Sequence, residues 1–239
     1  MKQNKTARGV KITWLGHSAF MIESPKGIVI LLDPWLDNPR APSNAKNFEK
    51  VDLILLTHGH GDHFGNTVEL AKRFNAKVIC NYEISLFLQK EGVTNVDGIN
   101  KSGTTTASGI AITMVDATHS STIEHNGELA YGGEPSGYVI RFENGFTLYD
   151  MGDTGVFGDM KLIAHMYKPD AVLVPIGGLF TMGPREAAKA CEMVKPKMII
   201  PMHYGTFPVL AGTPAELKKY LPASMRNRVV ALQPGESAG

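Results

Sequence analysis

The sequence has few cysteines and no long apolar run. Its two cysteines, Cys80 and Cys191, lie far apart in apolar segments, which argues against a disulfide framework or a zinc knuckle and favours two small core residues. No apolar stretch reaches the roughly 20 residues that a membrane-spanning helix needs. The polar N-terminal segment does not have the pattern of a secretory signal peptide. We therefore expect a cytoplasmic protein without a membrane span.

The sequence also lacks an excess of charge of either sign. It carries 24 basic and 23 acidic residues, which gives a formal net charge of +1. Electrostatic binding of nucleic acid or of an anionic membrane requires a basic surface, so neither partner is expected. A neutral chain can still hold a small anionic molecule through local groups, and a small-molecule substrate is the expected partner. The sequence leaves a homo-oligomer open.

The apolar pattern changes repeatedly between strand-like and helix-like spacing, without a linker, repeat or low-complexity segment. Strands are expected at residues 11–15, 19–23, 28–32, 52–57, 77–81, 109–117, 136–143, 146–150, 170–176 and 197–202, and helices at 66–74, 83–91, 159–167, 184–194 and 213–221. The polar stretch from Ser120 to Pro135 is expected to be an irregular functional loop. We predict one α/β domain over residues 1–239, with sheet packed on sheet and helices outside.

The most informative segment directly follows the apolar run at residues 52–57. It reads Thr57-His58-Gly59-His60-Gly61-Asp62-His63, so three of the chain's 8 histidines and a carboxylate fall within six consecutive positions. Imidazole nitrogens and carboxylate oxygens are the usual ligands of zinc and similar divalent ions. The two glycines are expected to let the backbone turn tightly enough to aim these side chains at one point. The segment predicts a metal site.

A loop this short cannot surround two ions, so further ligands should come from the ends of other strands. His119, Asp153 and His203 each come just after an apolar strand-like segment. Taken singly, each is as easily a satisfied loop residue as a ligand. As a set, they complete the donors that a two-metal site needs.

The order H-x-H-x-D-H, then a distant His, an Asp and a His, resembles the metallo-β-lactamase superfamily. The segments W-L-G-H-S, L-L-D-P and M-G-D-T-G resemble more closely its small bacterial metal-dependent hydrolases, which are related to the ascorbate-6-phosphate lactonase-like proteins. This resemblance implies a four-layer αββα sandwich. It also implies that one metal is held by His58, His60 and His119, a second by Asp62, His63 and His203, and that Asp153 bridges both.

The resemblance implies two divalent ions per chain, with zinc as the first expectation and manganese, nickel or iron as alternatives. A water between the ions, with its pKa lowered, would attack an electrophilic carbon or phosphorus. Asp62 is therefore a candidate for catalysis as well as for metal binding. The expected reaction is hydrolysis of a small ester-like bond: a lactone, a phosphodiester or a thioester. The alternative is a non-hydrolytic metal-binding, redox or sensing protein on the same fold.

Residue identities discriminate further within the superfamily. His60 stands where flavodiiron-type oxidoreductases carry Glu, and Asp153 stands where zinc β-lactamases carry cysteine or serine. Neither of those two activities is therefore expected.

Several further residues are candidates for supporting roles. His17 is expected beside the metals, binding substrate or protonating the leaving group, with a backbone-bonded turn histidine as the alternative. Asp33 and Thr57 are expected to orient the ligand histidines from behind. Tyr204 is a candidate donor to an oxyanion, or else a packing residue. Tyr131 is a candidate substrate contact, or else a solvated loop residue.

Overall fold

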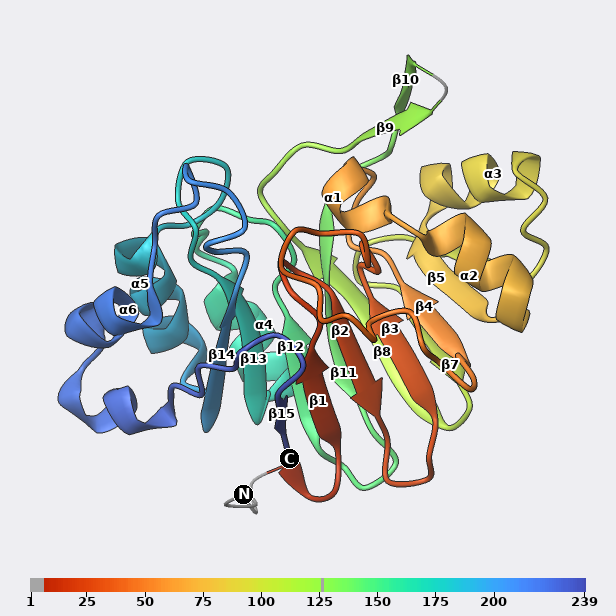
Figure 1. Ribbon diagram of the computed structural model, residues 1–239. Coiled ribbons are helices and arrows are strands. Elements are labelled where there is room, and N and C mark those ends of the chain that lie inside the picture. Colours follow the sequence, from red (N-terminus) through yellow and green to blue (C-terminus); the bar gives the residue numbers. More distant parts are fainter. Residues whose placement is uncertain (1–6, 126) are drawn as a thin grey trace.

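The computed structural model describes residues 7–125 and 127–239. Two β-sheets pack face to face, and helices cover their outer faces (Figure 1). This is the predicted αββα layering. Both cysteines are free and buried, as the sequence predicted. None of the helices in the described residues is long and apolar enough to span a membrane.

The first sheet contains seven strands. They are β1 (Lys11–Trp14), β2 (Phe20–Glu23), β3 (Val29–Leu32), β4 (Leu53–Leu55), β5 (Lys77–Asn81), β6 (Val96–Ile99) and β15 (Ser237–Ala238), in the order β15-β1-β2-β3-β4-β5-β6. The helices on its outer side are α1 (Gly61–Phe64), α2 (Thr67–Phe74) and α3 (Tyr82–Lys90).

The second sheet contains six strands. They are β7 (Thr104–Ala107), β8 (Ile110–Asp116), β11 (Ser136–Arg141), β12 (Thr147–Asp150), β13 (Ala171–Pro175) and β14 (Met198–Met202), in the order β14-β13-β12-β11-β8-β7. Its helices are α4 (Met160–Tyr167), α5 (Pro184–Val194) and α6 (Pro214–Tyr220), and a 3₁₀ helix follows at Ala223–Arg228. Thr213 caps α6 by accepting from the backbone N–H of Glu216, as its position before Pro214 predicted.

The strands of the first sheet are apolar on both faces because both faces are covered. In β4, Leu53 and Leu55 join the large core that includes the space between the sheets. Ile54 points the other way, into a second core with Leu70 of α2 and Leu88 of α3. A strand buried on both sides reads as a continuous apolar run, as this one does.

The stretch from Ser120 to Pro135 was predicted to be an irregular loop. Part of it instead forms a two-stranded hairpin. Strands β9 (Thr122–His125) and β10 (Glu128–Tyr131) pair antiparallel and extend beyond the sheets (Figure 1). All four residues of β10 are exposed, so no buried face imposes the alternating pattern that would have revealed the strand. Strands β6 and β7 were also missed, because Val96-Asp97-Gly98-Ile99 and Thr104-Thr105-Thr106-Ala107 carry few apolar residues.

Strand direction brings the predicted site residues to one edge of the molecule. Strand β3 is parallel to β4, and β1 runs in the same direction because two antiparallel pairings separate it from β3. In the second sheet, β12, β13 and β14 are parallel, and β8 shares their direction through β11. The segments that follow β1, β3, β4, β8, β12 and β14 therefore meet at the carboxyl ends of the strands, where loops present functional groups.

Candidate metal centre

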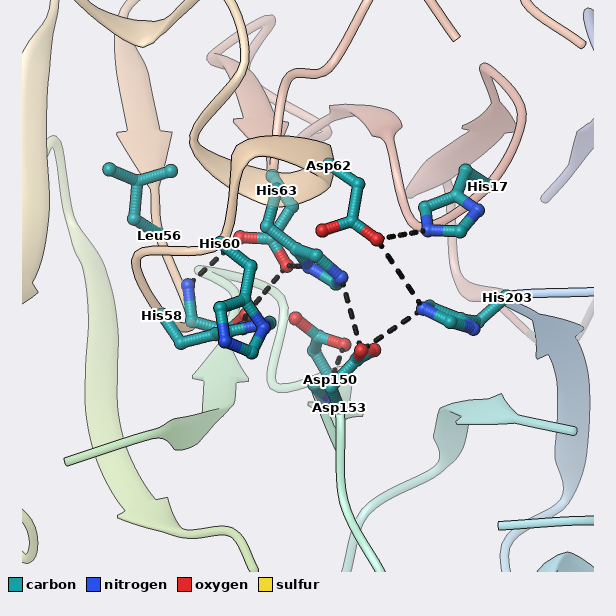
Figure 2. Close-up of polar contacts among 12 residues, drawn as sticks. His17, Leu56, His58, His60, Asp62, His63, Asp150, Asp153 and His203 are labelled. Carbon is teal, nitrogen blue, oxygen red and sulfur yellow. Dashed lines mark hydrogen bonds and ion pairs between the residues drawn. The ribbon is translucent and has the colours of Figure 1, made fainter. Parts of the chain in front are cut away.

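The histidine-rich motif leaves β4 as a short loop and continues into α1 (Figure 2). A Cβ on Gly59 would lie 2.8 Å from Ile123 Cγ1 and 3.1 Å from the carbonyl oxygen of Thr122, so this position needs glycine to pass close to β9. A Cβ on Gly61 would meet nothing within 4 Å. Neither glycine has a positive φ, so the turn itself requires neither, and only Gly59 is required, by close packing.

The first group of convergent side chains consists of His58, His60 and His119. One ring nitrogen of each lies within 4.8 Å of those of the other two. His58 Nε2 and His60 Nδ1 are 3.0 Å apart. His58 is buried, whereas His60 and His119 are half-buried, so this group is open to solvent on one side.

The second group consists of Asp62, His63 and His203, and it also includes His17. One ligand-type atom from each of the four lies within 4.8 Å of the others. His17 Nε2 is 3.0 Å from Asp62 Oδ2, and His203 Nε2 is 3.9 Å from the same oxygen. The sequence placed His17 beside the metals but did not predict this contact with Asp62.

Asp153 lies between the two groups. Its Oδ2 is 3.0 Å from His203 Nε2 and 3.3 Å from His63 Nε2 (Figure 2). The same oxygen is 3.6 Å from His119 Nε2. A carboxylate that reaches donors of both groups has the position that a bridging ligand requires.

The buried atoms of this cluster fit divalent metal ions. Within the described residues, Asp153 Oδ1 is buried without a hydrogen-bond partner, and the buried Nε2 atoms of His63 and His203 contact the Asp153 carboxylate without forming a well-directed hydrogen bond. Buried polar atoms in folded proteins almost always have a partner, because leaving one unpaired costs about 1–3 kcal/mol. Nitrogen and carboxylate oxygen atoms that converge in this way are the donor set of zinc and related ions.

Burial and mutual repulsion set the protonation of several of these groups. Burial, reinforced by the nearby His63, lowers the pKa of His58 well below its usual value, so His58 is a neutral imidazole, which is the form that binds metal. Burial also lowers the pKa of His17, to about 4. Burial alone would raise the pKa of Asp153, but His203 and His63 outweigh it and hold that pKa well below the usual range.

Asp33 and Thr57 orient two of the histidines from behind. Asp33 Oδ2 is 2.7 Å from His63 Nδ1, and it also accepts the hydroxyl hydrogen of Thr57 at 2.7 Å. Thr57 Oγ1 in turn is 2.9 Å from His58 Nδ1. These contacts fix the far nitrogens of both rings and leave their Nε2 atoms facing the site, as the supporting role expected for Asp33 and Thr57 requires.

Three of the site residues have strained backbones. His17, Asp33 and His203 have positive φ angles of 52°, 41° and 55°. A non-glycine residue in this region costs roughly 1–3 kcal/mol and persists only where its surroundings hold it. The carbonyl oxygen of His17 accepts from His203 N at 3.0 Å and from Trp14 Nε1 at 2.9 Å, which ties the two histidine-bearing turns together.

The two tyrosine candidates lie outside the cluster. Tyr204 is buried and stacks on Trp14, with ring centroids 5.2 Å apart, and Arg40 lies over both rings. This arrangement matches the interpretation of Tyr204 as a packing residue. Tyr131 is exposed at the end of β10, and within the described residues it forms no hydrogen bond to any of the predicted ligands.

Sequence reasoning missed two residues that belong to the site. Asp150 is buried beside Asp153, and its Oδ1 accepts from Gly152 N at 3.1 Å (Figure 2). Burial, with the nearby charge of Asp33, raises the pKa of Asp150 to about 8. Thr206 Oγ1 is 2.8 Å from His17 Nδ1. An acidic residue ending the buried strand β12 was a readable signal for Asp150, whereas the sequence around Thr206 carried none.

Comparison with known proteins gives consistent matches along the chain. The profile of a family described as "Beta-lactamase superfamily domain" matches residues 11–203. A UPF0173 metal-dependent hydrolase of Koribacter versatilis is 49% identical over 231 residues, covering 96% of this chain and 98% of that protein. A second one, of Methanosarcina barkeri, is 46% identical over 230 residues, covering 96% and 98%. The structure of Igni18, a metallo hydrolase of Ignicoccus hospitalis, is 36% identical with a TM-score of 0.85, covering 96% of this chain and 97% of that one.

Proposed function

Because this chain belongs to the Beta-lactamase superfamily domain family and is a metal-dependent hydrolase, we propose that it cleaves a small ester-like bond at two divalent metal ions. The single observation that carries this proposal is the convergence of the buried Nε2 atoms of His63 and His203 on the buried carboxylate of Asp153. Zinc is the first candidate for the metal, followed by manganese, nickel and iron. The cytoplasmic location, the homo-oligomer and the narrower likeness to ascorbate-6-phosphate lactonase-like proteins stay predictions.

We assign the ligands by the two groups of side chains and by the carboxylate between them. His58, His60 and His119 would hold one ion, and Asp62, His63 and His203 the other, with Asp153 shared. When bound, two such ions lower the pKa of a coordinated water and polarise the substrate oxygen. The chain supplies the fixed geometry, because Asp33 and Thr57 hold the rings of His63 and His58.

His17 acts on Asp62 in this proposal. An ionised carboxylate only accepts hydrogen bonds, so His17 Nε2 carries the hydrogen directed at Asp62 Oδ2, and Nδ1 accepts from the hydroxyl of Thr206. His17 therefore fixes one oxygen of Asp62 and leaves the other free to bind. His17→Gln, which keeps a donor, should retain both ions, whereas His17→Ala should lower occupancy of the second site. Full occupancy in His17→Ala would contradict this role.

The test of the function is a substrate screen on protein of known metal content. Several lactones, a thioester, bis-p-nitrophenyl phosphate and nitrocefin are offered with and without chelator. We expect chelator-sensitive cleavage of one ester-like class and no cleavage of nitrocefin. No turnover after reconstitution with zinc and with manganese would instead favour a metal-binding or sensing protein on this fold.

A further inference from the structure

The rim of the metal centre carries exposed apolar side chains on three loops. We call Trp35, Leu179, Phe180, Phe207 and Val209 the apolar rim. Leu179 is 72% exposed, Phe180 58%, Val209 53% and Phe207 39%, while Trp35 is half-buried. Large apolar residues exposed on loops that adjoin a site are candidates for a binding surface.

One part of the rim contacts the second group of site residues directly. The ring of Trp35 lies edge-on to His17 with centroids 5.2 Å apart, and the ring of Phe207 does so at 6.2 Å. Trp35 and Phe207 lie near-parallel to each other, at an angle of 29° and 6.1 Å apart. The two aromatic rings therefore form a wall beside the imidazole that contacts Asp62.

Backbone contacts fix the rest of the rim to the ligand-bearing loops. The loop with Phe207 and Val209 is closed by Gly205 N donating to Leu210 O at 2.9 Å, directly after His203. The loop with Leu179 and Phe180 begins at Gly177, close to His203. A Cβ on Gly177 would lie 2.1 Å from the carbonyl oxygen of His203. The same loop ends where Met182 N donates to the carbonyl oxygen of Thr154, beside Asp153.

The conformation of Leu179 adds an independent observation. Its φ is 53°, a left-handed value that is uncommon for a bulky side chain, and the side chain is nonetheless held out into solvent. Strained residues of this kind cluster at ligand-binding positions.

Among the described residues, no lysine or arginine side chain pairs with the cluster. Throughout residues 7–125 and 127–239, no lysine or arginine forms a hydrogen bond or ion pair with His17, Asp153 or any other residue of the two groups. Arg40 lies instead over the rings of Trp14 and Tyr204. Recognition of phosphate in proteins commonly relies on arginine or lysine, whereas here the proposed ions alone would meet that charge. The side chains around the site therefore supply apolar contact rather than further cations.

From this juxtaposition we propose that the apolar rim binds an aliphatic or aromatic arm of a neutral carboxylic ester, thioester or lactone, whose carbonyl group enters the metal centre. This inference rests on the proposed hydrolytic function and narrows its substrate class. Burying one methylene group changes binding by about fourfold, so the rim should give a graded dependence on chain length. A phosphodiester is the disfavoured substrate.

The test uses the metal-loaded protein and p-nitrophenyl esters of acetate, butanoate and hexanoate, with bis-p-nitrophenyl phosphate alongside. We expect kcat/KM to rise about fourfold per methylene, and this rise to flatten in Phe207→Ala and Phe180→Ala. The matched control is Leu162→Ala, because Leu162 is 54% exposed on α4, outside the rim. The control should keep the wild-type slope. Esters cleaved without chain-length dependence, or a preference for the phosphodiester, would overturn the proposal.

A binding measurement separates failure of this proposal from failure of the hydrolytic function. Affinities of acetyl, butanoyl and hexanoyl hydroxamates are measured calorimetrically, and they need no turnover. If no ester is cleaved, the hydrolytic function fails. An affinity for the hydroxamates that rises with chain length, and that no longer does so in Phe207→Ala, would still support the rim as a binding surface. Equal affinities would refute it. Light scattering tests whether a second copy of the chain covers the rim instead. If Phe207→Ala dissociates an oligomer while the dependence on acyl chain length stays unchanged, the proposal is refuted.

Discussion

At the scale of single residues, the cluster depends on a carboxylate that several imidazoles share. Asp153 Oδ2 lies within 3.6 Å of nitrogens from His63, His119 and His203. Asp153→Ala should therefore lower metal content to one ion or fewer per chain and abolish turnover, while circular dichroism shows an unchanged fold. His165→Ala is the control, because His165 is an exposed residue of α4. Retained activity at full metal loading would refute the shared role of Asp153.

The orienting carboxylate Asp33 should matter nearly as much as a ligand. Asp33→Asn weakens the acceptor for His63 Nδ1 and for the Thr57 hydroxyl. Metal affinity should fall about ten- to a hundredfold, the usual effect of losing such a partner, when measured by competition with a chromophoric chelator. Asp97→Asn, which weakens the acceptor for Lys77 and for the Thr105 hydroxyl away from the site, should leave the affinity unchanged. Equal affinities for all three proteins would contradict this role.

The residues of the site could be predicted from the sequence where ionisable groups cluster. The contacts between residues far apart in the sequence could not. His58, His60 and Asp62 stand out in the sequence because no structural need places so many ionisable groups together after a buried strand. The pairing of His17 with Asp62 and with Thr206 joins positions 45 and 189 residues apart. The first pairing depends on the order of strands within one sheet and the second on how the two sheets meet, and local sequence encodes neither arrangement.

At the scale of elements, the loop between β4 and α1 must pass close to β9. Gly59→Ala should destabilise the protein by about 1–3 kcal/mol and weaken metal binding, since its Cβ would approach Ile123 and the Thr122 backbone. Gly61→Ala is the matched comparison in the same loop, because its Cβ would have open space. Thermal unfolding of both variants checks this prediction. Equal melting temperatures would show that β9 adjusts without cost.

Elements with a buried face were predictable, and exposed or short elements were not. The spacing of apolar residues predicts helix α5 and strand β13, and α5 was predicted with the bounds that the structure has. Strand β10 has polar and apolar residues exposed alike, so periodicity is missing there, and Ile123 alone is buried in the described part of β9. Helix α1 has only four residues, too few for any period to appear.

At the scale of the whole molecule, one large core includes residues of both sheets. We therefore propose that the chain unfolds as one domain. Calorimetry should give a single transition with equal calorimetric and van't Hoff enthalpies. Bound metal at about 1,000 times its Kd adds about 4 kcal/mol, so a chelator should lower the melting temperature by roughly 10 °C. Two separate transitions would contradict the single domain.

The four-layer αββα sandwich was implied by the resemblance, and the alternating pattern supported it only through the general economy of packing sheet on sheet with helices outside. Strand β15 pairs with β1 across almost the full length of the chain, and no local signal predicts a two-residue strand. The edge where β1, β3, β4, β8, β12 and β14 end is nevertheless implied by their shared direction. This explains why residues chosen for following apolar strands meet in one place.

The most direct test of the whole account is the number of metal ions per chain. Protein purified without added metal, and then reconstituted with zinc or manganese, is measured by elemental analysis next to its Asp153→Ala variant. The account predicts close to two ions per wild-type chain, with chelator-sensitive hydrolysis of an ester-like bond. A chain that binds no metal under any of these conditions would contradict it.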